Sequence, residues 1–239
     1  MAGRDRLRWL TARPIAHRGL HDLARGRPEN SLAAFEAAIA GRYAIECDLH
    51  LAADGVPVVF HDDDLYRLTG EEGPVRDRTS AELGSFRLLG TQEWVPTLQE
   101  ILTAVEGRVP LLIELKHIAG RDQGFAAAVA EQLKRYDGPV ALMSFDPALV
   151  ADVKAAAPQL PRGLTASGDW RRGGEQLRAI RSLGADFVSY AIDDLPTWAP
   201  VVANRILGIP LICWTVRNPA QLAKAKVWTD QITFEGFLP

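Results

Sequence analysis

Cysteines and long apolar runs are both scarce in this chain of 239 residues. No apolar stretch approaches the roughly 20 residues that a membrane-spanning helix needs. The segment 1–14 is rich in arginine and lacks the apolar core of a secretory signal. The two cysteines, Cys47 and Cys213, are too far apart for a CxxC motif and lie in apolar runs. We therefore expect no structural disulfide and no stable membrane insertion, and a reducing, cytoplasmic compartment is the simplest assignment.

An excess of charge of one sign is also absent from the sequence. The 27 Lys and Arg residues are nearly balanced by 30 Asp and Glu residues, which gives a formal net charge of −3. A slightly acidic chain offers no basic surface for nucleic acid. The sequence therefore predicts a small molecule as the partner.

Short apolar runs alternate along the chain with helical patterns, which predicts a parallel sheet covered by helices. Nine runs are candidate strands, at residues 14–18, 43–51, 56–60, 111–116, 140–145, 161–165, 186–191, 210–215 and 231–235. A closed (β/α)8 barrel has eight strands, so one candidate is either wrong or part of an extra hairpin, and 161–165 is the weakest. An open doubly wound sheet is the alternative, but neither GxGxxG nor a Walker A motif follows the first strand to support it.

The stretch between His61 and Pro96 interrupts this alternation. It contains several glycines and no strong helical pattern. A loop of this length inside a compact domain is usually functional or forms a small subdomain. Because it follows a strand end, where barrel enzymes place their active sites, we expect an insertion over about residues 63–96 in a single domain spanning 1–239.

Polar residues stand near the ends of four consecutive candidate strands, where buried strands are normally apolar. These residues are His17 and Arg18, Glu46 and Asp48, His61 and Asp62, and Glu114 and Lys116. Residues i and i+2 of a strand share a face, so Glu46 and Asp48 point to one side, as do Glu114 and Lys116, whereas Cys47 points away. Charged side chains are rarely buried unless they are paired or bind something. We therefore expect these residues to meet at the carboxyl ends of neighbouring parallel strands.

Three carboxylates in one place cannot all stay ionised without a cation between them. Glu46, Asp48 and Glu114 are therefore candidate ligands for a hard divalent ion, Mg²⁺ or Ca²⁺, since all three offer oxygen and no HExxH motif is present. Arg18 and Lys116 beside such an ion would suit phosphate oxygens. The expected cluster is thus a site for a phosphate group.

His17 and His61 are suited to proton transfer near neutral pH. Taken singly, each polar residue has a simpler structural explanation: a strand-end histidine can be structural, and Glu114 with Lys116 can be a local ion pair. Taken together, the metal ligands, the cations and the imidazoles indicate phosphodiester hydrolysis.

The order and spacing of motifs between residues 14 and 116 resemble those of the glycerophosphodiester phosphodiesterase family. The matching segments include His17-Arg18-Gly19, Pro28-Glu29-Asn30-Ser31, Glu46-Cys47-Asp48, Asp54-Gly55, Val58 to Asp62, Arg67, Thr69-Gly70, Pro96 to Glu100 and Glu114-Leu115-Lys116. Ser144-Phe145 and Trp214-Thr215-Val216 continue the resemblance.

This resemblance implies a TIM barrel with a small subdomain inserted after the third strand, and hydrolysis of glycerophosphodiesters to an alcohol and sn-glycerol 3-phosphate. On the matching positions it implies the following roles: His17 and His61 as the acid–base pair, Glu46, Asp48 and Glu114 as metal ligands, and Arg18 and Lys116 as phosphate-binding residues. Phe145 and Trp214 are candidate walls of the substrate pocket.

The chain departs from the family pattern near its end, where Phe234 and Glu235 replace the usual Thr-Asp pair. We expect these two residues to reshape the mouth of the site. Two alternative functions remain open. A phospholipase D-like enzyme acting on lysophospholipids would need an exposed apolar rim near Arg87-Leu88-Leu89. A non-catalytic protein would bind glycerophosphodiesters without cleaving them.

Overall fold

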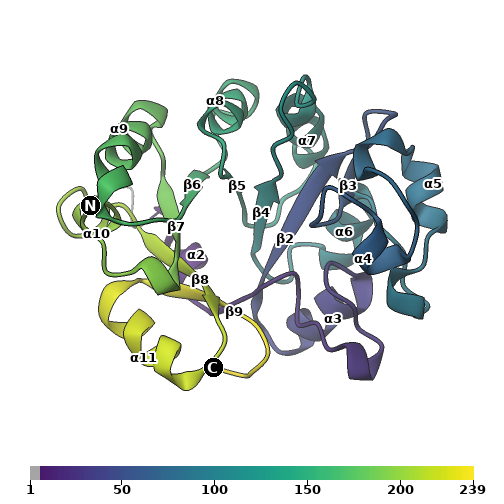
Figure 1. Cartoon of the computed structure of the whole chain (residues 1–239), viewed down its shortest axis with the longest axis horizontal. Coiled ribbons are helices and arrows are strands. Elements are labelled where there is room, and N and C mark those ends of the chain that lie inside the picture. Colours follow the sequence, from purple (N-terminus) through teal and green to yellow (C-terminus); the bar gives the residue numbers. More distant parts are fainter. Residues whose placement is uncertain (1–5) are drawn as a thin grey trace.

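The computed structural model describes residues 6–239, and its strands close into a barrel (Figure 1). Residues 1–5 lie outside the described residues. They begin the segment 1–14, for which the sequence predicts no secretory signal. The barrel strands are β1 (Ile15–Ala16), β2 (Ala44–Leu51), β4 (Leu111–Leu115), β5 (Val140–Ser144), β6 (Arg162–Ala166), β7 (Phe187–Ala191), β8 (Leu211–Val216) and β9 (Gln231–Phe234). They pair in parallel in the order β1-β9-β8-β7-β6-β5-β4-β2, and pairing of β1 with β2 closes the ring.

Helices follow the barrel strands and surround them on the outside (Figure 1). They are α3 (Leu32–Ala40), α6 (Leu98–Val105), α7 (Phe125–Leu133), α8 (Pro147–Ala156), α9 (Gly173–Leu183), α10 (Trp198–Arg205) and α11 (Pro219–Trp228), with short turns η1 (Leu23–Arg25), η4 (Trp170–Arg172) and η5 (Ile192–Asp194). Side chains that accept hydrogen bonds from the first turn mark several helix starts, as Ser31 does for α3 and Asp146 for α8. The apolar faces of helices and strands form one continuous core between the two layers.

The prediction of a TIM barrel is confirmed, but the weakest strand candidate was misjudged. Segment 161–165 corresponds to β6, which pairs with both β5 and β7. Its Gly163 weakens the strand pattern, yet it is required for packing, because a Cβ atom there would lie 2.3 Å from the ring of Phe187. The extra strand is instead β3 (Pro57–Val59), which pairs antiparallel with β2 and lies outside the closed ring.

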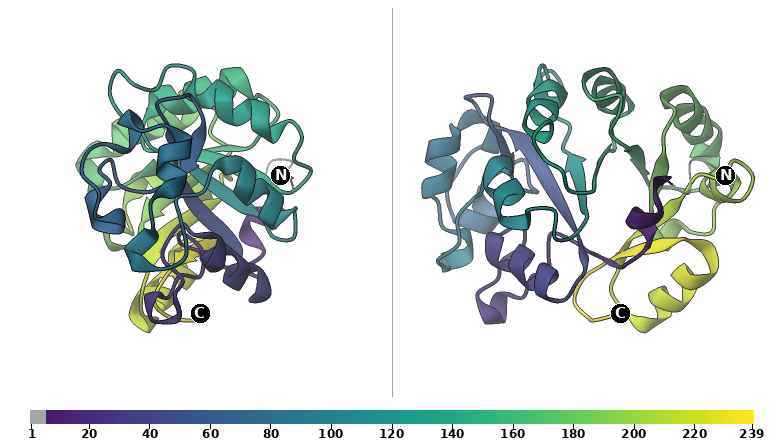
Figure 2. Two further views of the ribbon diagram at one scale, coloured as in Figure 1. Left: turned by 90° about the vertical axis from the view of Figure 1, so that its right-hand side faces the viewer. Right: turned by 180° about the vertical axis from the view of Figure 1, so that it is seen from behind.

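The segment after β3 consists of short elements at one side of the barrel (Figure 2, right). They are α4 (Tyr66–Thr69), η2 (Val75–Asp77), α5 (Ser80–Ser85) and η3 (Leu88–Gly90). Apolar side chains of this segment form a cluster of their own, which includes Phe60, Leu68 and Leu83. Whether residues 63–96 behave as a separate subdomain of one 1–239 domain stays a prediction.

The interior of the barrel is apolar toward the amino-terminal ends of the strands. There α2 (Arg8–Thr11) and the residue before it bury Leu10 and Leu7 against inward-facing side chains of the barrel strands, such as Ile15, Phe187 and Ile212. This packed layer fills the half of the barrel at the amino-terminal ends of the strands, as is usual for the fold. Inward-facing polar residues are therefore left to the carboxyl-terminal half.

Cys47 and Cys213 are buried and unbridged. Within residues 6–239, no helix combines the length and the hydropathy needed to cross a bilayer.

The turn after β1 depends on Gly19, which has a φ of +79°. A Cβ atom at Gly19 would lie 2.7 Å from Phe35 and 2.9 Å from the backbone of Ala34, whereas one at Gly55, with φ of +78°, would meet open space. Both Gly→Ala changes carry the left-handed backbone cost of about 1–2 kcal/mol. We predict that Gly19→Ala lowers the free energy of unfolding more than Gly55→Ala does, measured by urea denaturation. Equal losses would show that the close contact with α3 does not constrain the turn.

Candidate active site

A cavity of about 300 Å³ opens at the carboxyl-terminal end of the barrel. The structure brings together in its lining every residue to which the sequence assigned a catalytic, metal-binding, phosphate-binding or pocket-wall role: His17, Arg18, Glu46, Asp48, His61, Glu114, Lys116, Phe145 and Trp214. The lining also contains residues that the sequence did not suggest: Met143, Ser189, Thr215, Arg217 and Thr233.

The three predicted metal ligands form a buried cluster at one side of this pocket. Glu46 and Asp48 lie on β2, and Asp48 is directly opposite Glu114 on the adjacent parallel strand β4. One carboxylate oxygen from each of the three lies within 4.8 Å of the others. All three side chains are buried, at 2%, 2% and 6% exposure. The expectation that alternating residues of two neighbouring strands converge is therefore correct.

The electrostatics of the cluster fit a divalent cation. Burial, together with the charges of Asp48 and Glu114, raises the pKa of Glu46 well above its usual value. Burial also raises the pKa of Glu114 to about 7. Burial alone would raise the pKa of Asp48, but Lys116, His61 and Arg18 outweigh it and lower that pKa. Glu46 and Glu114 thus lack enough neighbouring positive charge to keep their usual pKa values. The three carboxylates offer only oxygen ligands, which suits a hard divalent ion.

Two cationic side chains border the carboxylates. Lys116 Nζ lies 2.8 Å from Glu114 Oε1 and 3.3 Å from Asp48 Oδ1. Arg18 has a left-handed backbone (φ 54°), and its main-chain N–H donates to Glu46 Oε2 over 3.0 Å. The Nε of Arg18 lies 3.4 Å from Asp48 Oδ2. An anion in this pocket would therefore find positive charge on the same side as the carboxylate cluster.

His61 lies in the pocket, but the strand before it runs in a direction that differs from the prediction. The prediction treats residues 56–60 as a parallel neighbour of the barrel strands, and this is wrong. The strand β3 runs back along β2, and the main-chain N–H of Phe60 donates to Asp48 O over 3.0 Å. This pairing places His61 beside the carboxylates, with its Nδ1 2.7 Å from Asp62 Oδ1.

His17 is held by the last strand of the barrel. Its Nδ1 lies 2.5 Å from Glu235 Oε2, and the Nε of Arg217 lies 2.5 Å from the other oxygen of Glu235. Burial would raise the pKa of Glu235, but its contacts with His17, His21 and Arg217 lower it well below the usual range. An ionised Glu235 can only accept, so Nδ1 of His17 carries the proton and Nε2 is left without one.

Phe234 does not reshape the mouth of the site as expected. Its side chain is 1% exposed and packs edge-on against the rings of Tyr43 and Phe237 in the outer core. Consecutive residues of a strand point to opposite sides, so Phe234 faces the helices. Of the two unusual residues near the end of the chain, only Glu235 contacts a site residue through its side chain, whereas Phe234 accepts from the main-chain N–H of His17 through its main-chain oxygen.

Three residues near the pocket support the site although the sequence assigned them no role. Asn30 Nδ2 donates to Asp48 Oδ2 over 2.9 Å. Glu29 accepts from Arg18 over 2.6 Å and from Arg67 over 2.8 and 2.9 Å. Arg67 also donates to Asp62, and these bonds lower the pKa of Asp62 to about 2. Glu29, Asn30 and Arg67 lie in the motifs that resemble the family, and this was the signal in the sequence from which a role in the site could have been predicted.

The rim required by the lysophospholipid alternative is absent from the place where it was expected. Leu88 is 1% exposed within the apolar cluster of the insertion; Leu89 is 41% exposed, but none of Arg87, Leu88 and Leu89 lines the pocket. The apolar surface at the pocket comes instead from Trp214 and Phe145, whose rings pack edge-to-face with centroids 5.4 Å apart. Phe145 is 45% exposed and forms part of the rim.

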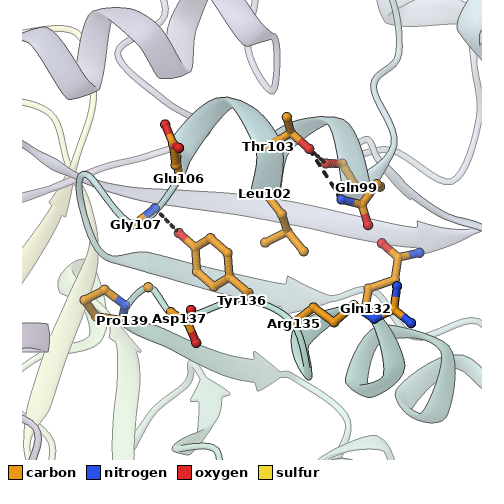
Figure 3. A pocket seen from close by; sticks show the side chains of 11 residues that line it. Gln99, Leu102, Thr103, Glu106, Gly107, Gln132, Arg135, Tyr136, Asp137 and Pro139 are labelled. Atoms are coloured by element: carbon orange, nitrogen blue, oxygen red, sulfur yellow. Dashed lines mark hydrogen bonds between the residues drawn. The ribbon is translucent and has the colours of Figure 1, made fainter.

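A larger cavity of about 740 Å³ lies between the carboxyl-terminal ends of α6 and α7, at the opposite end of the barrel (Figure 3). Tyr136 crosses it, and its hydroxyl accepts a hydrogen bond from the main-chain N–H of Gly107 over 3.2 Å. No histidine or cysteine is present in its lining, and the carboxylates there, Glu106 and Asp137, are exposed. Of these two cavities, only the smaller one combines histidines with buried carboxylates.

Comparison with known proteins agrees with this geometry. The model of the Glycerophosphoryl diester phosphodiesterase family matches residues 17–236. The chain belongs to this family. A provisionally named glycerophosphodiester phosphodiesterase of Bacillus subtilis, YhdW, is 31% identical over 222 residues, which cover 89% of each chain. The glycerophosphodiester phosphodiesterase of Caldanaerobacter subterraneus is 34% identical over 160 residues, covering 63% of this chain and 65% of that protein.

Solved structures of the family share the fold. A phosphodiesterase of Oleispira antarctica, solved in complex with the product sn-glycerol-3-phosphate, superposes with a TM-score of 0.83 at 26% identity over 93% of this chain and 92% of that one. The glycerophosphodiester phosphodiesterase of Thermotoga maritima gives a TM-score of 0.74 at 26% identity, with 92% of each chain covered.

The carboxylate cluster predicts that a divalent cation stabilises the folded protein. At a hundredfold excess over its Kd, an ion that binds only the folded state adds about 2.7 kcal/mol. After chelation, Mg²⁺ or Ca²⁺ is expected to raise the melting temperature of the wild type but not that of a Glu46→Gln/Glu114→Gln double variant. Glu36→Gln, on the exposed surface of α3, is the matched control and keeps the response. An equal shift in the double variant would place the ion elsewhere.

Proposed function

We propose that this protein hydrolyses glycerophosphodiesters to an alcohol and sn-glycerol 3-phosphate, with Mg²⁺ or Ca²⁺ held by Glu46, Asp48 and Glu114. The observation that carries the proposal is one pocket that contains a buried acidic cluster, two cationic side chains and two histidines whose Nδ1 atoms contact carboxylates. The Oleispira antarctica relative, bound to sn-glycerol-3-phosphate, supports the same product for this chain.

Arg18 and Lys116 would bind the phosphate and neutralise the negative charge that grows on its oxygens as the bond to the leaving alcohol breaks. Both side chains are already held by carboxylates, so little further ordering is needed when the substrate binds. A divalent cation bound at the carboxylates would supply Lewis-acid polarisation of the phosphoryl oxygens.

His17 and His61 would move the protons. Burial lowers the pKa of both rings, which favours their neutral forms at neutral pH. In each ring a carboxylate holds Nδ1, so Nε2 is the nitrogen left for exchange with substrate or water. One histidine would accept a proton from the attacking hydroxyl, and the other would donate a proton to the departing alcohol.

A purely binding role would require only the phosphate-binding half of this arrangement. Two imidazoles, each oriented by a carboxylate in one phosphate site, have no use in a binder, so we favour catalysis. The lysophospholipid alternative lacks support at Leu88 and Leu89, because Leu88 is buried and the exposed Leu89 does not line the pocket.

Removal of either imidazole tests the catalytic assignment. We predict that His17→Ala and His61→Ala each lower kcat on glycerophosphocholine by about 10²–10⁴-fold, followed by phosphorus-31 NMR of the products. His117→Ala is the control, since His117 lies outside the pocket with its side chain 42% exposed. Near-wild-type turnover in either pocket variant, with circular dichroism showing an intact fold, would refute the acid–base roles.

The contact between Glu235 and His17 gives a separate prediction. Glu235→Gln keeps the size of the side chain but allows its amide to face Nδ1, which would shift the ring proton to Nε2. Loss of the correct tautomer in this way lowers kcat by up to about 10⁴-fold in a serine protease. We expect a large loss in kcat with little change in KM, measured by steady-state kinetics. A variant that changes KM alone would show that Glu235 acts on substrate binding instead.

A further inference from the structure

The lining of the active-site pocket is divided into two chemically different halves. Charged residues lie on one side, after β1 and on β2 and β4, as described above. The other side, on β5 and β7 to β9, carries neutral residues: Met143, Phe145, Ser189, Trp214, Thr215 and Thr233. Only Arg217, with its side chain 53% exposed at the rim, adds a charge there.

Two hydroxyl groups in the neutral half lack hydrogen-bond partners among the described residues. Ser189 on β7 is fully buried, and Thr233 on β9 is 1% exposed. The Oγ of Ser189 and the Oγ1 of Thr233 make no hydrogen bond within the described chain, and the same is true of Trp214 Nε1 between them on β8. Leaving a buried polar group unpaired is unfavourable, so these three strands present hydrogen-bonding capacity that faces the pocket.

These groups lie deep in the pocket rather than at its rim. Ser189 shares the inward face of β7 with Phe187, which belongs to the packed layer that closes the barrel interior. Thr233 is paired in register with Ile15 of the same layer. Phe145, in contrast, is 45% exposed. A ligand that reaches Ser189 and Thr233 must therefore be largely enclosed.

We propose that Ser189 and Thr233 bind the free hydroxyl groups of the glycerol arm, so that this arm enters the barrel and the leaving alcohol faces the rim. The assignment rests on the proposed function. A glycerophosphodiester has one charge at its centre and two arms, and the charged half of the pocket is suited to the phosphate. A hydroxyl both donates and accepts, so buried Ser and Thr side chains match a glycerol diol. A charged head group would instead need an opposite charge, and a hydrocarbon chain would leave these hydroxyls unpaired.

Binding of small phosphate monoesters tests this assignment without any need for turnover. The probes are sn-glycerol 3-phosphate and n-propyl phosphate, which differ in the two hydroxyls, titrated calorimetrically in the same Mg²⁺ buffer. We expect Ser189→Ala and Thr233→Val each to raise the Kd of sn-glycerol 3-phosphate by about 2- to 10-fold, the worth of one neutral hydrogen bond. The Kd of n-propyl phosphate is expected to stay unchanged in both variants.

Two further variants serve as controls. Thr233→Ser retains the hydroxyl and is expected to bind sn-glycerol 3-phosphate much as the wild type does. Thr165→Val removes a buried hydroxyl that also lacks a partner within the described chain but lines the neighbouring 130 Å³ cavity, so it should change neither Kd. Because neither Ser189 nor Thr233 has a side-chain hydrogen bond to lose, both variants are expected to keep the melting temperature of the wild type.

Three results would overturn the assignment: equal weakening of both probes, no change for either probe, or a wild type that binds the two equally. The first would indicate altered pocket shape, and the second would mean that water alone satisfies the hydroxyls. The proposed function fails separately, through absence of product from glycerophosphocholine, even where the difference between the two probes is found.

Discussion

Three buried carboxylates that lie close to one another are the constraint on which the arrangement of this barrel's site depends. Two neighbouring parallel strands fix Asp48 opposite Glu114, so the separation cannot relax without breaking the sheet. Like charges in an apolar setting are unfavourable, and the chain compensates with Lys116, with Arg18 and with the amide of Asn30. Burial outweighs this compensation and keeps the pKa values of Glu46 and Glu114 raised, which fits a site for a further cation.

The same network extends into the insertion and makes it part of the site. Arg67, on α4, donates to both Asp62 and Glu29, which in turn contact His61 and Arg18. Arg76 is 1% exposed; it donates to the main-chain oxygen of Lys116 and pairs with Asp122 over 2.6 Å. Two arginines of the inserted segment thus hold the groups around a histidine and a lysine of the pocket. The segment is therefore more than a surface loop.

The sequence predicts those parts of the site that depend on one strand at a time. Alternation within a strand places Glu46 with Asp48 and Glu114 with Lys116, and the closed barrel follows from the spacing of strands and helices. Ring closure depends on pairing between distant segments. The direction of β3 is instead set locally, by a hairpin with β2 across the turn at Asp54-Gly55, and the prediction that placed β3 among the parallel strands did not use that turn. The contact of His17 with Glu235 joins residues 218 positions apart and requires β1 to lie against β9. No local pattern carries that information.

The division of the pocket separates two tasks that a phosphodiesterase must perform. A charged half that binds phosphate would accept almost any phosphodiester, because the phosphate group is common to all of them. Under the proposed glycerol assignment, discrimination would then come from the neutral half, where one arm of the substrate would meet buried hydroxyls and the other the exposed aromatic rim. Glu235 is an instructive exception, since it directly follows β9 beside the neutral half and yet contacts His17 of the charged half. A change at the end of this strand would therefore act on catalysis through residue 235 and, under the proposed glycerol assignment, on selectivity through residue 233 of β9.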